Sequence, residues 1–344
     1  MKKQLKIIIV EPNWLGDVIF TTPAFKALKE AYPKSFLAVV VAPRAAPILE
    51  NNPYIDKIFK LDEKKEEKNI VSKIKFIQKI KSYHFNKAIF FHRSTTKTLL
   101  IFLAKVKERI GYDYKKRSLL LTKRIPTIKK DSVHKQDYYL NILKKSGLLI
   151  TDKNCQIYLR NDEKEDIKKI VGQINSLKNN YLIGLNPFSN WAPKNWPLLN
   201  YQELIKKILN KYPNSTFFLT SKNREKKIIP LFSQFGKKVI DLSGKTTLRQ
   251  LACLYNYLDL VISGDSGPLH LAGAIGTNFI GIYGPTSPNC TKPVNKATGY
   301  VLFENDICPV PCYQKDCLMQ YRCIKKIKPN DVFKYVQELL KKKG

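Results

Sequence analysis

The chain has 344 residues, a hydrophobic content of 44% and a formal net charge of +33. The length is enough for two domains with separate cores, the composition is ordinary for a soluble globular protein, and apolar runs such as residues 99–104 are too short to span a bilayer. The charge indicates a polyanionic partner, but no helix-turn-helix, RNP or zinc-finger spacing indicates nucleic acid.

Strands and helices alternate from the N-terminus. The basic start leads into a short β-branched run that ends at Glu11, so we interpret it as a first strand and not as a signal peptide. Apolar runs predict strands at residues 6–10, 35–41, 55–59 and 87–91. Helical spacing predicts helices from the turn at 12–17 to about residue 32, and at 47–51, 63–81 and 96–106. This alternation indicates a parallel sheet covered on both faces.

The pattern loosens between residues 115 and 160, with one helix near 136–145, and then resumes. Further strands are expected near residues 181–186, 215–220, 238–242, 258–263 and 278–283. The simplest architecture is α/β, with two doubly wound, Rossmann-like domains facing each other across a cleft. We place these domains at 1–160 and 161–328, the second ending in a cysteine-rich tail, and a C-terminal helix at 329–344. Ligands of such sheets bind beyond the C-terminal strand ends.

The stretch 260–276, LVISGDSGPLHLAGAIG, combines a buried strand, a glycine turn and a helix start. Unpaired N–H groups and the helix dipole favour an anion at such a start, and Gly267 lets a ligand approach the backbone. This predicts a phosphate site, with Asp265 or Ser266 acting only as a helix cap as the simpler alternative. The GDSGP sequence lacks the second glycine of a serine-protease motif, so a protease is set aside.

Six segments carry a family resemblance. They are PNWLGDVIFTTPAFKALKEAYP at 12–33, NPYIDKI at 52–58, HRSTTKTLLIFLAKVKERIGY at 92–112, GLNPFSNWAPKNWP at 184–197, SGDSGPLHLAGAIGTNFIGIYGPTSP at 263–288 and the cysteine-rich tail. In this order they resemble glycosyltransferase family 9, the ADP-heptose:lipopolysaccharide heptosyltransferases, and most of all the heptosyltransferase II branch. The resemblance covers nearly the whole chain. It implies the GT-B fold, with the acceptor on the N-terminal domain and the nucleotide-sugar on the C-terminal domain.

The resemblance also implies an activity. It is the inverting transfer of heptose from ADP-L-glycero-D-manno-heptose to the inner core of lipopolysaccharide, with no metal cofactor required. Asp17 matches the general base of the family, and a single displacement needs a carboxylate to take the proton of the attacking hydroxyl. The alternative role of Asp17 is a helix N-cap.

On the donor side, positive charge must meet the leaving diphosphate. Lys194 matches the family lysine that contacts the phosphate and sugar of the donor, and Asp265 matches the acidic residue that binds donor hydroxyls. The further donor-binding residues expected from the resemblance are Ser189, Asn190, Ser266, Gly267 and His270. Arg224 and Glu225 are weaker candidates for ribose contacts.

On the acceptor side, Arg93, Ser94 and Lys97 follow an expected strand end, where a phosphorylated, acidic saccharide would suit them. Arg44 and His134 are further candidates by position and charge. The lipid-anchored acceptor implies a cytoplasmic enzyme that contacts the anionic inner-membrane surface peripherally and binds no nucleic acid.

Four of the seven cysteines cluster near the C-terminus, at Cys308, Cys312, Cys317 and Cys323. Four thiols so close together can close a tetrahedral structural zinc site, although none of the gaps has the common length of two residues. Reduced thiols or a labile disulfide are the alternatives.

Two other functions stay open. A sugar-nucleotide epimerase of the same fold would act on the donor without an acceptor. A polyanion-binding protein that is not an enzyme would explain the charge but would leave Asp17 and the Asp265 loop without a role.

Overall fold

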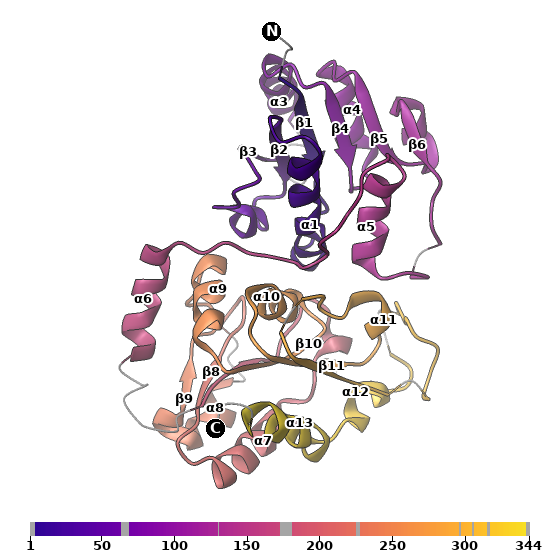
Figure 1. Cartoon of the computed structure of the whole chain (residues 1–344). Helices are drawn as coiled ribbons and strands as arrows, with labels where there is room; N and C mark the ends of the chain where they lie inside the picture. The colour runs from indigo at the N-terminus through magenta and orange to yellow at the C-terminus, as the bar shows by residue number, and fades with distance from the viewer. Residues whose placement is uncertain are drawn as a thin grey trace. The chain divides into compact units, whose positions relative to one another are not determined.

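The computed structural model describes residues 4–62, 69–129, 131–172, 181–224, 228–295, 297–304, 306–314 and 317–341. The chain divides into two compact units, Met1–Tyr158 and Leu159–Gly344. Each unit contains a six-stranded parallel sheet with helices on its faces (Figure 1). The expected α/β class with two doubly wound sheets is therefore confirmed.

The first sheet has the strand order β3-β2-β1-β4-β5-β6, and its printed pairings are all parallel. Its strands are β1 Lys6–Val10, β2 Phe36–Val41, β3 Lys57–Lys60, β4 Lys87–Phe90, β5 Glu108–Tyr112 and β6 Lys123–Ile125. The winding reverses between β1 and β4. Because parallel crossovers are right-handed, this reversal puts the connecting helices on opposite faces and opens a ligand position at the ends of β1 and β4.

The helices of the first unit are α1 Leu15–Ala31, η1 Ala46–Leu49, α3 Ile70–Ser82, α4 Thr95–Leu103, η2 Lys115–Leu120 and α5 Lys135–Lys144. Helices α3 and α4 cover one face of the sheet, where Phe76 and Ile101 join a buried cluster with Ile8 and Val40 of the strands. Helix α5 packs against α1. The expected helix at 47–51 is a short 3₁₀ turn, and the first part of the helix expected at 63–81 lies outside the described residues.

Strands β5 and β6 were not among the expected strands. Both lie toward one edge of the sheet, and β6 has only three residues with two of them exposed. Short strands near a sheet edge with charged side chains show little apolar periodicity, so the sequence pattern does not predict them as strands.

The second sheet has the order β12-β11-β10-β7-β8-β9 and is likewise parallel. Its strands are β7 Leu182–Asn186, β8 Thr216–Leu219, β9 Val239–Asp241, β10 Leu260–Gly264, β11 Phe279–Tyr283 and β12 Gly299–Phe303. Its helices are α6 Asn161–Gly172, η3 Ala192–Lys194, α7 Leu198–Lys211, α8 Ile228–Phe232, η4 Ser233–Lys238, α9 Leu248–Tyr257, α10 Gly267–Ile275, α11 Pro288–Thr291, α12 Arg322–Lys326 and α13 Pro329–Lys341. The winding reverses between β7 and β10, which again marks the strand ends where a ligand binds.

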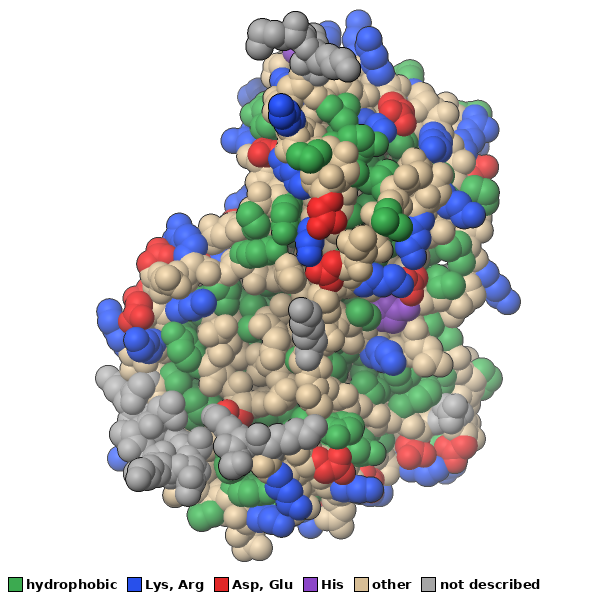
Figure 2. All heavy atoms as spheres, in the orientation of Figure 1, with side chains coloured by type: hydrophobic (Ala, Val, Ile, Leu, Met, Phe, Trp, Pro, Cys, Tyr) green, Lys and Arg blue, Asp and Glu red, His purple; other side chains and the backbone are tan. Residues whose placement is uncertain are grey.

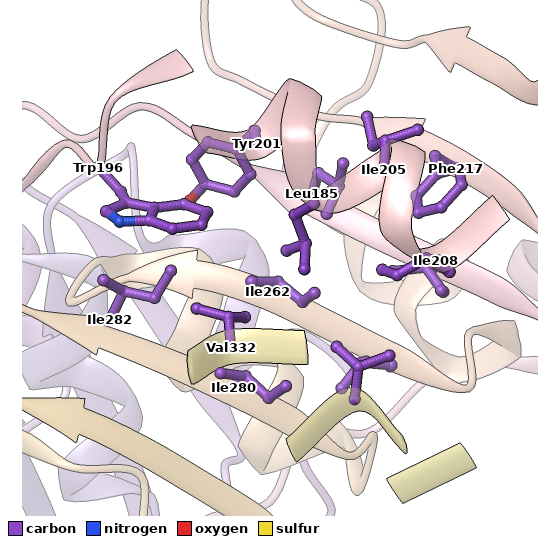
Figure 3. Close-up of a cluster of buried hydrophobic side chains, with 14 of the residues drawn as sticks. Leu185, Trp196, Tyr201, Ile205, Ile208, Phe217, Ile262, Ile280, Ile282 and Val332 are labelled. Atoms are coloured by element: carbon purple, nitrogen blue, oxygen red, sulfur yellow. The ribbon is translucent and has the colours of Figure 1, made fainter. Parts of the chain in front are cut away.

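The core of the second unit holds the loop after β7 in place. Trp196 is buried, and its ring lies edge-on to Tyr201 of α7 at 4.9 Å between centroids (Figure 3). Its Nε1 donates a hydrogen bond to the carbonyl of Ile327 at 2.9 Å. Burial of a Trp with its N–H satisfied stabilises the fold by a few kcal/mol, so this indole anchors the loop that carries Lys194, two residues before it, to the core.

Among the described residues, no helix is both long and apolar enough to cross a bilayer. The chain carries 61 Lys and Arg against 28 Asp and Glu, and on the visible face the basic side chains are spread over both units (Figure 2). The excess of positive charge is therefore not confined to one binding site on that face.

Candidate active site

Asp17 lies in the first turn of α1, directly beyond β1. The N-cap position of this helix is Trp14, and no side chain caps it. The alternative reading of Asp17 as an N-cap is therefore wrong. The carboxylate instead lines a cavity of about 250 Å³ at the ends of β1 and β4, within the first unit.

Two residues of α5 hold the Asp17 carboxylate. The Lys135 ammonium lies 3.2 Å from Asp17 Oδ1. Burial, the charge of Asp17 and a hydrogen bond to Asp17 raise the pKa of Tyr139, so its hydroxyl stays protonated. Lys135 and Tyr139 are separated by one helical turn and both line the cavity. The side chain of Asp17 is only 11% exposed, so its orientation is fixed by these neighbours.

The mouth of this cavity carries an exposed aromatic ring. Trp14 is 56% exposed, and the Arg44 guanidinium stacks on its ring at 4.6 Å from the centroid. Arg44 also donates from Nε to the carbonyl of Asn13 at 2.8 Å. An exposed indole with a cation beside it suits a sugar ring that carries an acidic group.

Arg93 lies on the same cavity, immediately after β4. Its guanidinium lies against the rings of Tyr114 and Tyr138, at 4.9 Å from each centroid, and Nε donates to the Tyr138 hydroxyl at 2.6 Å. Among the described residues Arg93 donates no hydrogen bond besides this one. Its two terminal nitrogens are therefore available to bind an anion in a bidentate manner. The structure thus brings the expected acceptor residue Arg93 together with the expected base Asp17.

Ser94 and Lys97 both form contacts within the chain, and of the two only the buried Lys97 contradicts its expected acceptor contact. Ser94 is the N-cap of α4 and accepts from the backbone N–H of Lys97 at 3.2 Å. The Lys97 side chain is buried, and Nζ donates to Asn13 Oδ1 at 2.8 Å and to the Glu11 carbonyl at 3.4 Å. The expectation that Lys97 binds the acceptor is therefore wrong. Its ammonium group is buried beneath the loop that precedes Asp17 and holds that loop in place. His134 caps α5 by accepting from the Gln136 N–H at 3.1 Å.

The donor-side residues of the second unit meet at the ends of β7 and β10. Lys194 Nζ lies 2.7 Å from Asp265 Oδ2, and His270 Nε2 lies 3.3 Å from Asp265 Oδ1. Gly264 permits this approach: a Cβ there would come within 2.5 Å of the Lys194 carbonyl oxygen. The residue therefore has to be glycine for the two loops to meet.

Asp265 is 2% exposed. Burial alone would raise its pKa, but the hydrogen bond from His270 and the positive charge of Lys194 outweigh burial and hold the pKa below the usual range. Asp265 is thus a permanent anion that orients Lys194, whose side chain remains 22% exposed. The arrangement presents an ammonium group to solvent at the strand ends.

The N-terminus of α10 has no side-chain cap. Ser266 occupies the N-cap position, but its hydroxyl lies 3.0 Å from the Ser263 hydroxyl instead. The interpretation of Asp265 or Ser266 as a helix cap is therefore wrong. Gly267 is the first residue of the helix, so its N–H points out of the helix start together with the positive end of the dipole.

The loop that contains Ser189 and Asn190 is closed by its own hydrogen bonds. The Ser189 hydroxyl lies 2.7 Å from the Trp191 carbonyl and 2.8 Å from Asn195 Oδ1, which also accepts from the Ser189 N–H at 2.8 Å. Asn190 is exposed at the tip. Of the weaker ribose candidates, Arg224 is exposed after β8, and Glu225 lies outside the described residues.

The four C-terminal cysteines are free thiols. In the described part of the chain, no group of three or more His, Cys, Asp or Glu side chains is arranged to hold a metal ion. No disulfide joins Cys308, Cys312, Cys317 and Cys323, and a structural zinc site formed by these thiols stays a prediction.

The family model described as glycosyltransferase family 9 (heptosyltransferase) matches residues 73–322. The chain belongs to glycosyltransferase family 9. This membership confirms the resemblance and makes the chain a glycosyltransferase. The lipooligosaccharide heptosyltransferase 2 of Haemophilus ducreyi is 26% identical over 85% of this chain and 87% of its own length.

Solved structures of the family share the fold. The family 9 glycosyltransferase of Veillonella parvula superposes with a TM-score of 0.88 at 23% identity, covering 99% of each chain. An E. coli heptosyltransferase, WaaC, with ADP-2-deoxy-2-fluoro heptose superposes with a TM-score of 0.72 at 19% identity, covering 97% of this chain and 99% of the other. At these identities the likeness supports the GT-B fold alone.

The residues that the sequence analysis missed are those brought in by packing. Lys135 and Tyr139 come from a helix that was expected, but the face it turns toward Asp17 depends on how α5 packs on α1. Trp14 lies within a quoted motif, PNWLGD, and a tryptophan in a glycine turn after a strand was an available signal. No sequence signal indicated that the rings of Tyr114 and Tyr138 lie against Arg93.

Proposed function

We propose that this family 9 enzyme transfers a heptose, with inversion, from ADP-L-glycero-D-manno-heptose to the inner core of lipopolysaccharide. The proposal rests on family membership and on one observation above others: a carboxylate, Asp17, held by Lys135 and Tyr139 in a cavity at the end of β1. The heptosyltransferase name of the relatives supports the sugar, and the ADP-heptose analogue bound by one structural neighbour supports the nucleotide.

In this mechanism the C-terminal unit binds the donor. The α10 N-terminus and the Lys194 ammonium meet the diphosphate, and their charge stabilises the ADP that leaves. Asp265 acts as the positioning residue of Lys194. Its buried carboxylate is already occupied by Lys194 and His270. We propose that these groups replace a metal ion in stabilising the leaving group.

The N-terminal unit binds the acceptor. Arg93 and Arg44 bind acidic groups of the saccharide, and the Trp14 ring packs on a sugar face. Asp17 takes the proton of the attacking hydroxyl as this oxygen forms the new bond to the anomeric carbon and the bond to ADP breaks. The Tyr139 hydroxyl and the Lys135 ammonium keep the carboxylate aimed during this step. The lipid anchor of the acceptor would bring the enzyme to the cytoplasmic face of the inner membrane as a peripheral protein.

The test is transfer from ADP-heptose to a deacylated inner-core acceptor. Asp17→Asn preserves shape and removes the base, so we expect kcat to fall roughly 10²- to 10⁴-fold with ADP affinity unchanged. Asp137→Asn, at an exposed carboxylate of α5 that pairs with Lys153, is the matched control and keeps wild-type rates. Wild-type turnover by Asp17→Asn would overturn the assignment of the base.

The same assay separates the other functions. An epimerase would change the donor with no acceptor present, whereas we expect the sugar to remain unchanged without an acceptor. Transfer is expected to survive EDTA, and a strict requirement for added Mg²⁺ would contradict the proposed role of Lys194 and α10.

A further inference from the structure

One face of the N-terminal unit is apolar, and the three elements that form it contain no acidic residue. Helix α4 exposes Leu99, Phe102 and Leu103, with exposed fractions of 41%, 42% and 46%. Leu119 of η2 is 77% exposed, and Ile74 of α3 is 47% exposed. These five residues are called the α4 face below. They belong to one surface because α4 packs against α3 on one side and against η2 on the other.

The spacing of the exposed residues on α4 shows that they form one stripe. Leu99, Phe102 and Leu103 are three and four residues apart, so they share a side of the helix. Leu100 and Ile101 occupy the other side and are buried against the sheet. The stripe is therefore a second apolar side on a helix whose core side is already satisfied.

Exposed basic side chains lie on and beside the same three elements. From residue 69 to residue 107 the sequence contains no Asp or Glu. Exposed basic residues on or next to the three elements are Lys75, Lys79 and Lys81 of α3, Lys105 and Lys107 after α4, and Lys115 and Lys116 of η2. Apolar side chains next to exposed lysines match an anionic bilayer surface, where the apolar chains enter the interface and the ammonium groups meet phosphates.

The same charges argue against a second copy of this chain as the occupant. A two-fold contact through the α4 face would place two lysine-rich surfaces against each other, and like charges at an interface cost several kcal/mol. A polyanion such as nucleic acid would satisfy the lysines but would leave the exposed leucines and phenylalanine in water. A lipid surface satisfies both.

We propose that the α4 face is the surface by which this enzyme docks on the anionic leaflet that carries its acceptor. This inference rests on the proposed function, because that function supplies a lipid-anchored substrate. The geometry connects the two: α4 begins next to Arg93 in the acceptor cavity and ends in the exposed stripe, nine residues or about 13 Å later. A docked enzyme therefore presents its acceptor cavity close to the membrane surface.

The test is sedimentation of the full chain with vesicles of phosphatidylglycerol and phosphatidylethanolamine, compared with phosphatidylcholine vesicles. We expect binding to the anionic vesicles only, and we expect it to weaken with salt. The double variant Leu103→Ser/Leu119→Ser and the double variant Lys105→Glu/Lys107→Glu should each lower the partition coefficient about 10-fold or more.

Matched controls exist elsewhere on the chain. Leu199→Ser, at a 63% exposed leucine of α7, and Lys206→Glu on the same helix should bind vesicles as wild type does. All variants should transfer heptose to a water-soluble, deacylated acceptor at wild-type rates, which shows that they are folded. Asp17→Asn should bind vesicles normally while losing transfer, so failure of docking and failure of the proposed function give different results.

Three outcomes would overturn the inference. One is wild-type partitioning by both α4-face variants. Another is equal loss of binding in the α7 controls, which would indicate net charge and not a particular face. The third is a concentration-dependent dimer of the wild type that the α4-face variants abolish, which would make a second copy the occupant.

Discussion

At the scale of single residues, the two proposed half-sites use buried ion pairs in the same way. Asp17 is oriented by Lys135, and Lys194 is oriented by Asp265. In each pair one member is buried and the other remains partly exposed. A charge held in place by an ion-pair partner needs little reorganisation when a ligand binds, which is the condition for effective electrostatic stabilisation.

Lys194→Met tests the donor side. The substitution removes the ammonium group but keeps an apolar stem of similar length, and it leaves the Asp265 carboxylate with His270 and Tyr283. A hydrogen bond to a charged group contributes about 1.5–3 kcal/mol, so we expect ADP affinity to fall roughly 10- to 100-fold by calorimetric titration. Lys207→Met, on α7 and 31% exposed, should leave the affinity unchanged. Equal ADP affinities of the wild type, Lys194→Met and Lys207→Met would refute this role of Lys194.

Glu11→Gln tests a buried carboxyl below the Asp17 loop. Burial raises the pKa of Glu11 from 4.5 to about 8, so the folded protein keeps a proton that the unfolded chain has lost in this interval. The stability that this proton contributes is complete below pH 4.5 and is lost as pH rises through 8. Relative to wild type, the variant should gain on the order of a few kcal/mol in unfolding free energy between pH 5 and 9.

Urea denaturation at pH 5, 7 and 9 measures this difference. Glu30→Gln, at a side chain of α1 that is 48% exposed, is the control and should follow the wild-type pH dependence. Parallel curves for wild type and Glu11→Gln would show that Glu11 is ionised at neutral pH in the folded protein.

At the scale of elements, both half-sites lie where the winding of a sheet reverses. The first turn of α1, which follows β1, carries Asp17, and the region after β4 carries Arg93. The loops after β7 and β10 carry Lys194 and Asp265. Parallel strands direct their C-terminal ends to one edge, and the reversal leaves room there because the neighbouring crossovers run to opposite faces. The positions of these residues therefore follow from strand order.

Gly264→Ala tests the contact between the two donor loops. The new Cβ would lie 2.5 Å from the backbone oxygen of Lys194, which cannot rotate away. We expect displacement of the Lys194 loop and a loss of ADP affinity of at least about 10-fold, with a stability loss of about 1–3 kcal/mol. Gly184→Ala on the adjacent strand β7 is the control: its Cβ would meet the movable tip of Leu258 at 2.7 Å, so ADP affinity should persist.

At the scale of the whole molecule, the two units have separate sheets and separate cores. The proposed function divides the chemistry in the same way, with the donor on one unit and the base and acceptor on the other. Such a division lets each unit bind its substrate through its own rigid framework.

Hydrogen exchange with ADP tests this division. A ligand present at about 100 times its Kd stabilises the state that binds it by about 2.7 kcal/mol. We expect slower exchange around residues 189–196 and 264–270, with residues 11–18 and 131–140 little changed. Protection that appears mainly in the N-terminal unit would contradict the donor assignment.

The sequence by itself determined the fold class, and it marked Asp17 and the Asp265 loop as candidate site residues. Period-two and apolar runs predicted most of the strands, because a strand buried on both faces must be apolar. The glycine turns after strands marked Asp17 and the Asp265 loop, since only such turns bring backbone near a ligand. These are local properties, so the pattern of neighbouring residues carries them.

The tertiary structure alone decided which side chains act together. Lys97 was expected at the acceptor, yet it is buried beneath the Asp17 loop, and Lys135 and Tyr139 reach Asp17 from a helix more than a hundred residues away. The ion pair between Asp265 and Lys194 likewise joins two loops that are about seventy residues apart in the sequence, while the donor contact expected of Asp265 stays a prediction. Contacts of this kind depend on the packing of distant elements, and no local spacing records how one helix rotates against another.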